Sequence, residues 1–180
     1  MNKFYHMTIA GCERDLPLCP INDKLDIAGF VMFSDVELTI AVAKELLKIS
    51  PDFDVLITAE SKGIPLGYEM ARQSGKPYVV ARKAPKLYMV NPHKVDVKSI
   101  TTSKLQQLYL DDHDVQKLAG KKVLIVDDVI STGESLRAVE ELVNYAKGNI
   151  VAKVAVLAEG DSADRKDILF LEKLPLFPHE

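Results

Sequence analysis

Residues 122–135 read Lys-Val-Leu-Ile-Val-Asp-Asp-Val-Ile-Ser-Thr-Gly-Glu-Ser and indicate the fold of the chain. The apolar run at residues 123–126 is rich in β-branched side chains and predicts a strand buried on both faces of a parallel sheet. Two carboxylates, Asp127 and Asp128, follow directly. Burying ionised carboxylates without partners is costly, so we expect this pair at the open end of the strand.

A polar loop and then a helix follow the two carboxylates. The loop consists of Ser131, Thr132, Gly133, Glu134 and Ser135. Apolar residues at helical spacing continue to Ala146, and Gly148 is expected to cap the end of the helix. Hydroxyls, a glycine and free backbone N–H groups at a helix N-terminus form a site for phosphate. The order strand, acid pair, phosphate site and helix is therefore predicted within a short segment.

This stretch resembles the signature of the type I phosphoribosyltransferases, proteins that bind phosphoribosyl pyrophosphate (PRPP). The resemblance implies that Asp127 and Asp128 hold the ribose hydroxyls and that residues 131–135 wrap the 5′-phosphate. Glu134 stands where a glycine is commoner in the family, so we expect its N–H rather than its side chain to face the phosphate. A strand–loop–helix unit with a solvated acidic turn is the alternative, but it does not require acids and hydroxyls in this order.

Length and composition fit one domain over residues 1–180. The chain is 47% hydrophobic and 27% charged, which is ordinary for a globular protein, and its net charge of −3 predicts no nucleic-acid partner. Because we see no membrane-spanning run and no signal segment, we expect a cytoplasmic protein without a membrane partner. Cys12 and Cys19 are expected as free thiols, with a disulfide or a two-ligand metal site as alternatives.

The whole pattern predicts an α/β fold with a mainly parallel sheet flanked by helices. Residues 1–33 are expected to form an irregular cap, or hood, before a core at 34–161 and a tail at 162–180. Ser34 and Glu37 predict a capping box for a helix that Pro51 ends. Because strands and helices alternate, we expect right-handed crossovers. The further expected elements are strands at 54–58, 78–81, 151–158 and 168–170, and a helix at 65–74 ended by Gly75.

Residues 84–120 interrupt this alternation. Residues 94–98 alternate like an exposed strand, and residues 108–110 could be its antiparallel partner. A segment this long between two core strands is usually functional. By the resemblance it occupies the place of the mobile loop that closes over PRPP, with Lys104 as a candidate cation for the pyrophosphate.

A second loop is expected at the same edge of the sheet as the acid pair. It follows the strand at 54–58 and consists of Glu60, Ser61, Lys62 and Gly63. Ligands of open α/β sheets bind at the carboxyl ends of the strands, and this loop resembles the pyrophosphate loop of adenine phosphoribosyltransferases. Arg82 and Lys83, at the end of the next strand, would add two positive charges, with a solvated strand end as the alternative.

The hood would hold the base. Phe30 and Phe33 could stack on a flat heterocycle, with simple packing as the alternative, and Val129 and Ile130 are further base-contacting candidates. No lysine follows the strand at 153–158, where relatives that use 6-oxopurines often place one, which favours adenine. Against adenine stands the missing Glu-Tyr pair that many adenine-specific relatives carry within the 84–120 segment.

The resemblance implies a Mg²⁺-dependent purine phosphoribosyltransferase of purine salvage, acting as a homodimer. Adenine and PRPP would give AMP and pyrophosphate, with hypoxanthine, guanine or xanthine as alternative bases. Mg²⁺ prefers substrate oxygens and water to an all-protein cage, so we expect no dense ligand cluster.

A non-catalytic PRPP-sensing regulator is a further alternative, but it would normally need an added DNA-binding region. A receiver-type signalling domain is disfavoured because its acid pair comes from an early strand. A nucleotide-binding ATPase is disfavoured because Gly-x-x-x-x-Gly-Lys-Ser/Thr is missing from the sequence.

Overall fold

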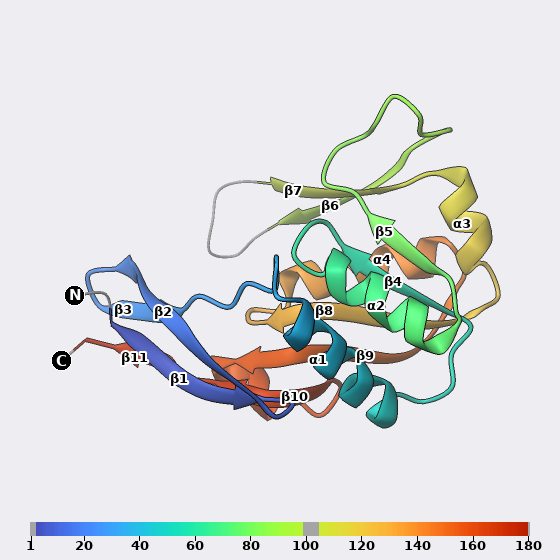
Figure 1. Ribbon diagram of the computed structural model, residues 1–180. Helices are drawn as coiled ribbons and strands as arrows, with labels where there is room; N and C mark the ends of the chain where they lie inside the picture. Colours follow the sequence, from blue (N-terminus) through green and yellow to red (C-terminus); the bar gives the residue numbers. More distant parts are fainter. Residues whose placement is uncertain (1–2, 99–104, 180) are drawn as a thin grey trace.

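The core is a five-stranded parallel sheet in the order β10-β9-β8-β4-β5 (Figure 1). In this computed structural model residues 3–98 and 105–179 are described. The central strand is β8 (Lys122–Ile130), between β9 (Asn149–Glu159) and β4 (Val55–Ala59). The edge strands are β10 (Leu169–Leu174) and β5 (Tyr78–Ala81). The predicted α/β class with a mainly parallel sheet is thus confirmed.

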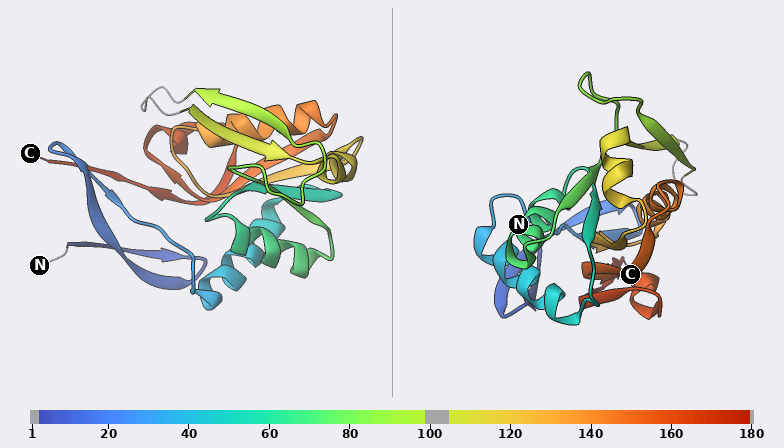
Figure 2. Two further views of the ribbon diagram at one scale, coloured as in Figure 1. Left: turned by 90° about the horizontal axis from the view of Figure 1, so that it is seen from above. Right: turned by 90° about the vertical axis from the view of Figure 1, so that its right-hand side faces the viewer.

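Helices cover both faces of this sheet (Figure 2). On one face lie α1 (Val36–Ile49) and α2 (Ile64–Ser74), which pack with Leu124 and Val126 of β8. On the other face α4 (Glu134–Tyr145) packs with Val123 and Ile125, as the two-residue period of a strand requires. Within the described part of the chain, none of the helices is both long and apolar enough to span a bilayer.

Two helix ends differ from the prediction. The N-cap of α1 is Asp35, whose side chain accepts the N–H of Leu38 at 3.1 Å, whereas Ser34 lies one residue earlier with φ 67°. After α4, Lys147 rather than Gly148 takes the left-handed conformation. A Cβ at Gly148 would lie 2.8 Å from Val123 Cγ2, so this glycine allows close packing rather than a helix cap.

The hood is a regular antiparallel sheet, not an irregular cap. It contains β1 (Phe4–Ile9), β2 (Cys12–Asn22) and β3 (Leu25–Ala28). Its fourth strand, β11 (Leu176–Pro178), comes from the end of the chain and pairs with β3, so both ends of the described chain lie in the hood sheet. The expected tail is therefore divided between two sheets, because β10 joins the core. Cys12 and Cys19 are both free thiols.

Residues 84–120 form more regular structure than expected. The alternation at 94–98 predicted the antiparallel ribbon of β6 (His93–Lys98) and β7 (Leu105–Leu110). A short helix, α3 (Asp112–Leu118), was not expected. Arg82 and Tyr109 exchange backbone hydrogen bonds of 2.9 and 2.8 Å, which attaches the ribbon to the end of β5. Lys104 lies outside the described residues.

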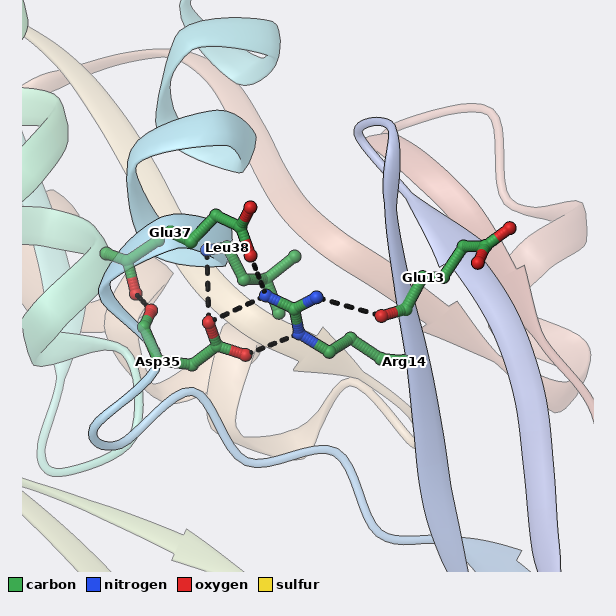
Figure 3. Close-up of polar contacts among 6 residues, drawn as sticks. Glu13, Arg14, Asp35, Glu37 and Leu38 are labelled. Atoms are coloured by element: carbon green, nitrogen blue, oxygen red, sulfur yellow. Dashed lines mark hydrogen bonds and ion pairs between the residues drawn. The ribbon is translucent and has the colours of Figure 1, made fainter.

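Arg14 of β2 links the hood to the core (Figure 3). Its Nε and Nη2 donate to the two carboxylate oxygens of Asp35 at 2.7 and 2.9 Å, and Nη2 also donates to Glu37 at 2.8 Å. Glu37 therefore binds the hood instead of closing a capping box. The hydrogen bonds from Arg14 hold the pKa of Asp35 below its usual value. One carboxylate thus fixes both the start of α1 and the position of β2.

We expect Arg14→Ala to lower the free energy of unfolding by about 1.5–3 kcal/mol, because charge-assisted hydrogen bonds to Asp35 are lost. Folding lowers the pKa of Asp35 from 3.8, so this stabilisation is present above that value and is lost as the pH falls through the folded pKa. Urea unfolding at pH 7 and pH 3 should show the difference between parent and variant shrinking in acid.

Glu45→Gln is the control, because it removes the exposed Lys48–Glu45 ion pair on α1. This change should cost less than about 1 kcal/mol. A loss in Arg14→Ala no larger than in the control would contradict the role given to Arg14.

Candidate functional site

Asp127 and Asp128 lie within β8 rather than beyond its end. Pairing of β8 with β9 continues to Ile130 opposite Ala158, whereas pairing with β4 stops at Ile125. The expectation that the strand ends at the acid pair is therefore wrong, because β9 carries the strand onward. β8 consequently projects beyond its β4 pairing at the carboxyl edge of the sheet, and both carboxylates lie at that edge.

The two carboxylates have different surroundings. Asp127 Oδ1 accepts the backbone N–H of Asp128 at 2.9 Å. Asp128 is only 4% exposed, and its Oδ2 lies 3.4 Å from Lys62 Nζ without a hydrogen-bond partner among the described residues. A buried acceptor that lacks a hydrogen bond costs about 1–3 kcal/mol. This oxygen is therefore suited to accept a hydrogen bond from a ligand.

Burial disfavours the charged form of Asp127. Burial raises the pKa of Asp127 well above its usual 3.8, and the neighbouring charge of Asp128 raises this pKa further. The hydrogen bond from the Asp128 N–H and the charge of Lys62 act in the opposite direction. A ligand that donates hydrogen bonds or carries positive charge would offset the cost.

A cavity of about 350 Å³ opens at this edge. Its walls come from the ends of β4 and β8, from β7 and from the first turns of α4. The predicted site residues that line it are Glu60, Ser61, Lys62, Gly63, Lys83, Asp127, Asp128, Val129 and Ser135. Ala59, Leu108 and Ala138 line it as well. The loop after β4 and the acid pair of β8, which the sequence placed at one edge, thus share one cavity.

Glu60, which lines the cavity, binds Arg82, which does not. The Glu60 carboxylate accepts the Lys83 N–H at 2.9 Å and Arg82 Nε at 3.2 Å, and both bonds lower its pKa. Arg82 Nη1 donates to the Tyr88 hydroxyl at 2.6 Å. The Arg82 side chain thus binds Glu60 and Tyr88, and Arg82 is not among the residues that line the cavity. Lys62 and Lys83 are the cations that line the cavity within the described chain.

Gly63 lets the loop lie against the end of β4. A Cβ at this position would overlap Thr58 Oγ1 and would lie 3.6 Å from Asp127 Oδ1. Thr58 Oγ1 is itself buried without a hydrogen-bond partner in the part of the chain that the structure describes. Any side chain at residue 63 would therefore push the loop away from the acid pair.

The turn from β8 into α4 has the geometry expected of an anion site. Gly133 is the N-cap of α4 with φ 81°, a left-handed conformation that favours glycine. Because glycine offers no side-chain oxygen, it does not cap the N–H groups of the first turn. Such N–H groups can bind an anion. Ser131 and Thr132 are exposed, while Ser135 lines the cavity.

The apolar candidates for the base divide into two pairs. Phe30 is 3% exposed and packs in the core with the hood and α1, so the prediction that its ring stacks on a base is not supported. Ile130 is 2% exposed and packs in the core with α4, on the face of β8 opposite Val129. Phe33 is 49% exposed and Val129 lines the cavity.

Two charged residues near the site were not expected. Glu159 is the last residue of β9. Burial raises the pKa of its carboxyl group, and the nearby charge of Lys62 acts in the opposite direction. The sequence does contain a signal for this residue, because it is a charged residue at the end of a core strand. Arg165 follows the 3₁₀ helix η1 (Gly160–Asp164), and its Nη1 lies against Gly133. No local sequence signal connects Arg165 with a glycine thirty-two residues earlier.

The chain is an α/β protein with a parallel sheet, and its acid pair and the N-terminus of α4 lie at the carboxyl edge of that sheet, where ligands of such folds bind. The family model described as "Phosphoribosyl transferase domain" matches residues 37–174. The chain therefore belongs to the phosphoribosyltransferase family, whose members are pentosyltransferases.

The similar proteins are named for different purine bases. The hypoxanthine/guanine phosphoribosyltransferase of Methanothermococcus okinawensis is 33% identical over 160 residues, 84% of each chain. The adenine phosphoribosyltransferase of Agathobacter rectalis is 32% identical over 130 residues, 67% of this chain and 72% of the relative.

Solved structures confirm the fold. The adenine phosphoribosyltransferase of Thermoanaerobacter pseudethanolicus aligns with a TM-score of 0.68 at 20% identity, covering 95% of each chain. The Saccharomyces cerevisiae adenine phosphoribosyltransferase, solved with adenine and an imino-altritol bisphosphate, aligns with a TM-score of 0.66 at 21% identity, covering 94% of this chain and 93% of the other.

We expect Asp127→Asn to maintain or raise the free energy of unfolding at pH 7.5. The amide oxygen can still accept the Asp128 N–H, while the desolvated charge beside Asp128 is removed. Because folding raises the pKa of Asp127, its contribution favours the fold below 3.8 and is lost as the pH rises through the folded pKa. Urea unfolding should therefore show that the free energy of unfolding of the variant rises relative to that of the parent between pH 4 and pH 8.

Asp52→Asn is the matched control of opposite sign, because Lys122 lowers the pKa of Asp52. This variant should lose stability relative to the parent as the pH rises from 3 to 5. If Asp127→Asn lost more stability than Asp52→Asn at pH 7.5, the surroundings described for the acid pair would be incorrect.

Proposed function

We propose that the chain is a Mg²⁺-dependent purine phosphoribosyltransferase of purine salvage, which converts PRPP and a purine base to a nucleoside 5′-monophosphate and pyrophosphate. The observation that carries this proposal is the shared cavity, in which the acid pair of β8 meets residues 60–63 beside the start of α4. One site thus offers acceptors for a diol, donors for a phosphate and cations for a pyrophosphate.

Each part of PRPP is assigned to one part of the cavity. The ribose hydroxyls donate to Asp127 and Asp128, which supplies the partner that Asp128 Oδ2 lacks. The 5′-phosphate accepts hydrogen bonds from the backbone N–H groups and hydroxyls of residues 131–135. The pyrophosphate lies along residues 60–63, with Lys62 and Lys83 as its cations.

This arrangement suits a reaction that needs no protein nucleophile. Breaking the bond between C1′ and pyrophosphate leaves positive charge on the ribose and negative charge on the leaving group. The carboxylates lie beside the first charge, and Lys62 and Lys83 beside the second. Holding both substrates in one cavity supplies the rest of the rate enhancement through orientation.

The donor set fits a Mg²⁺ ion that is held mainly by the substrate. Mg²⁺ takes oxygen ligands and keeps several waters. The described ranges contain no group of three or more His, Cys, Asp or Glu placed for a metal, but Asp128 Oδ2 is a buried carboxylate oxygen without a hydrogen bond. Asp127 and Asp128 would contact the ion only through water and the ribose hydroxyls of PRPP, and bound Mg²⁺ would neutralise charge on the departing pyrophosphate.

We propose adenine as the preferred base. Its 6-amino group is a donor and needs an acceptor, and Glu159 places a carboxyl group at the same sheet edge. Phe33 and Val129 are the apolar groups proposed to contact the ring. The adenine enzyme of Agathobacter rectalis supports this choice. A 6-oxopurine is the second candidate, supported by the Methanothermococcus okinawensis enzyme.

A cytoplasmic homodimer is the state that we propose for the active protein. Val36, Ile40 and Tyr68 are 68%, 44% and 55% exposed beside one hollow between α1 and α2. An apolar patch of this kind suits contact with a second copy of the chain. Sedimentation velocity should give twice the mass of the chain, and a monomer at micromolar concentration would exclude this state.

The test is a steady-state assay with PRPP, Mg²⁺ and each of adenine, hypoxanthine, guanine and xanthine. We expect the highest kcat/KM with adenine, because a mismatched base leaves a buried polar group unpaired at about 1–3 kcal/mol. A higher value for a 6-oxopurine would replace adenine with the second candidate. PRPP binding without turnover of any base would indicate a PRPP-sensing regulator.

The double variant Asp127→Asn, Asp128→Asn tests the ribose contacts by calorimetry. Each lost charge-assisted hydrogen bond should weaken PRPP binding by roughly 10- to 150-fold. The matched control is Asp52→Asn, Asp54→Asn, which removes two carboxylates beside Lys122 at the opposite end of the strands. Unchanged PRPP affinity in the first pair would refute the central assignment.

A further inference from the structure

Arg165 lies directly against the turn that begins α4. A Cβ on Gly133 would overlap Arg165 Nη1 and would lie 3.7 Å from its Cζ. A side chain at residue 133 would therefore displace this guanidinium, and the positive φ of Gly133 also favours glycine. The contact joins the 131–135 loop to a residue that follows β9 and η1, far along the chain.

The guanidinium is held in place from its other side. Arg165 Nε and Nη2 donate to the two carboxylate oxygens of Asp167 at 2.9 and 2.7 Å. This two-point contact fixes the plane of the guanidinium. It leaves Nη1 as the nitrogen that faces Gly133.

Asp167 is in turn anchored to the core. Lys153 of β9 donates to Asp167 and to Glu140 of α4, both at 2.6 Å. The Lys153 side chain is 15% exposed and that of Asp167 is 51% exposed, so the lysine end of this link is the more buried one. The ion cluster connects β9, the segment before β10 and α4, and its guanidinium end meets the start of α4.

The charges of residues 131–135 bear on the role of Arg165. The segment 131–135 contains no basic residue and one acidic residue, Glu134. A phosphate monoester carries nearly two negative charges at neutral pH. Backbone N–H groups and hydroxyls supply donors there but no full positive charge. Arg165 is the cation that the structure places against this loop.

We propose that Arg165, oriented by Asp167, is a positioning residue of the 5′-phosphate site. It holds the turn at Gly133 and presents its guanidinium Nη1 to the loop, while Asp167 balances part of its charge. This inference rests on the proposed function, because it assigns the 131–135 loop to the 5′-phosphate. The ligand class is a ribose 5-phosphate ester, as in PRPP and the product nucleotide, and not the pyrophosphate group.

The test compares two anions that bind at different ends of the cavity. Calorimetry should show that Arg165→Gln weakens binding of ribose 5-phosphate by roughly tenfold or more. Binding of inorganic pyrophosphate with Mg²⁺ should change less than about twofold, since Lys62 and Lys83 are intact. In steady state the KM for PRPP should rise while kcat at saturating PRPP stays close to that of the parent.

Arg72→Gln is the matched control, because Arg72 also binds one carboxylate through two nitrogens, at 2.9 and 2.8 Å, but on α2. Its affinity for ribose 5-phosphate should equal that of the parent. Equal affinities in Arg165→Gln and Arg72→Gln would overturn the proposal. If the parent turned over PRPP normally in that case, the proposed function would stand without Arg165.

Arg165→Lys keeps the proposal testable if Arg165→Gln does not fold. Lysine retains the charge but cannot match the two-point contact with Asp167. We expect a smaller loss of ribose 5-phosphate affinity than in the Gln variant, with pyrophosphate binding unchanged. An equal loss for both anions would show a purely structural role. Failure of the parent to bind ribose 5-phosphate or PRPP would overturn both this inference and the proposed function.

Discussion

The unequal pairing of β8 is the constraint on which the site depends. Its partner β9 continues to the end of the strand, while pairing with β4 stops at Ile125. Two adjacent carboxylates, Asp127 and Asp128, can therefore lie in a regular strand and still face a cavity. Their desolvation is costly, and Lys62 offsets it only in part, at 3.4 Å from Asp128 Oδ2. The family fold places this unfavourable charge where a ligand can compensate it.

Close backbone approach is the second requirement at this edge. Gly63 brings the loop after β4 against Thr58, and Gly133 brings the start of α4 against Arg165. In both places a Cβ would overlap a polar side-chain atom. The hood is held separately, through the bonds from Arg14 to Asp35.

The sequence was informative where the signal is local. Residues 122–135 predicted the central strand, the acid pair at the sheet edge and the following helix, because apolar runs and turn residues are short-range patterns. It failed where partners are distant, as for β11 in the hood sheet and Arg165 beside Gly133. Ser34 and Asp35 are both good N-cap residues, so only the contact with Arg14 distinguishes them.

The most direct test of the account is an amide chemical-shift map of the protein titrated with PRPP and Mg²⁺. The ribose and both phosphate groups are assigned to one edge of the sheet. The largest shifts should therefore fall on the amides of residues 60–63 and 127–135, with small shifts in β1 and β2. Largest shifts at the opposite end of the strands, around residues 52–54 and 122, would contradict the assignment of the cavity.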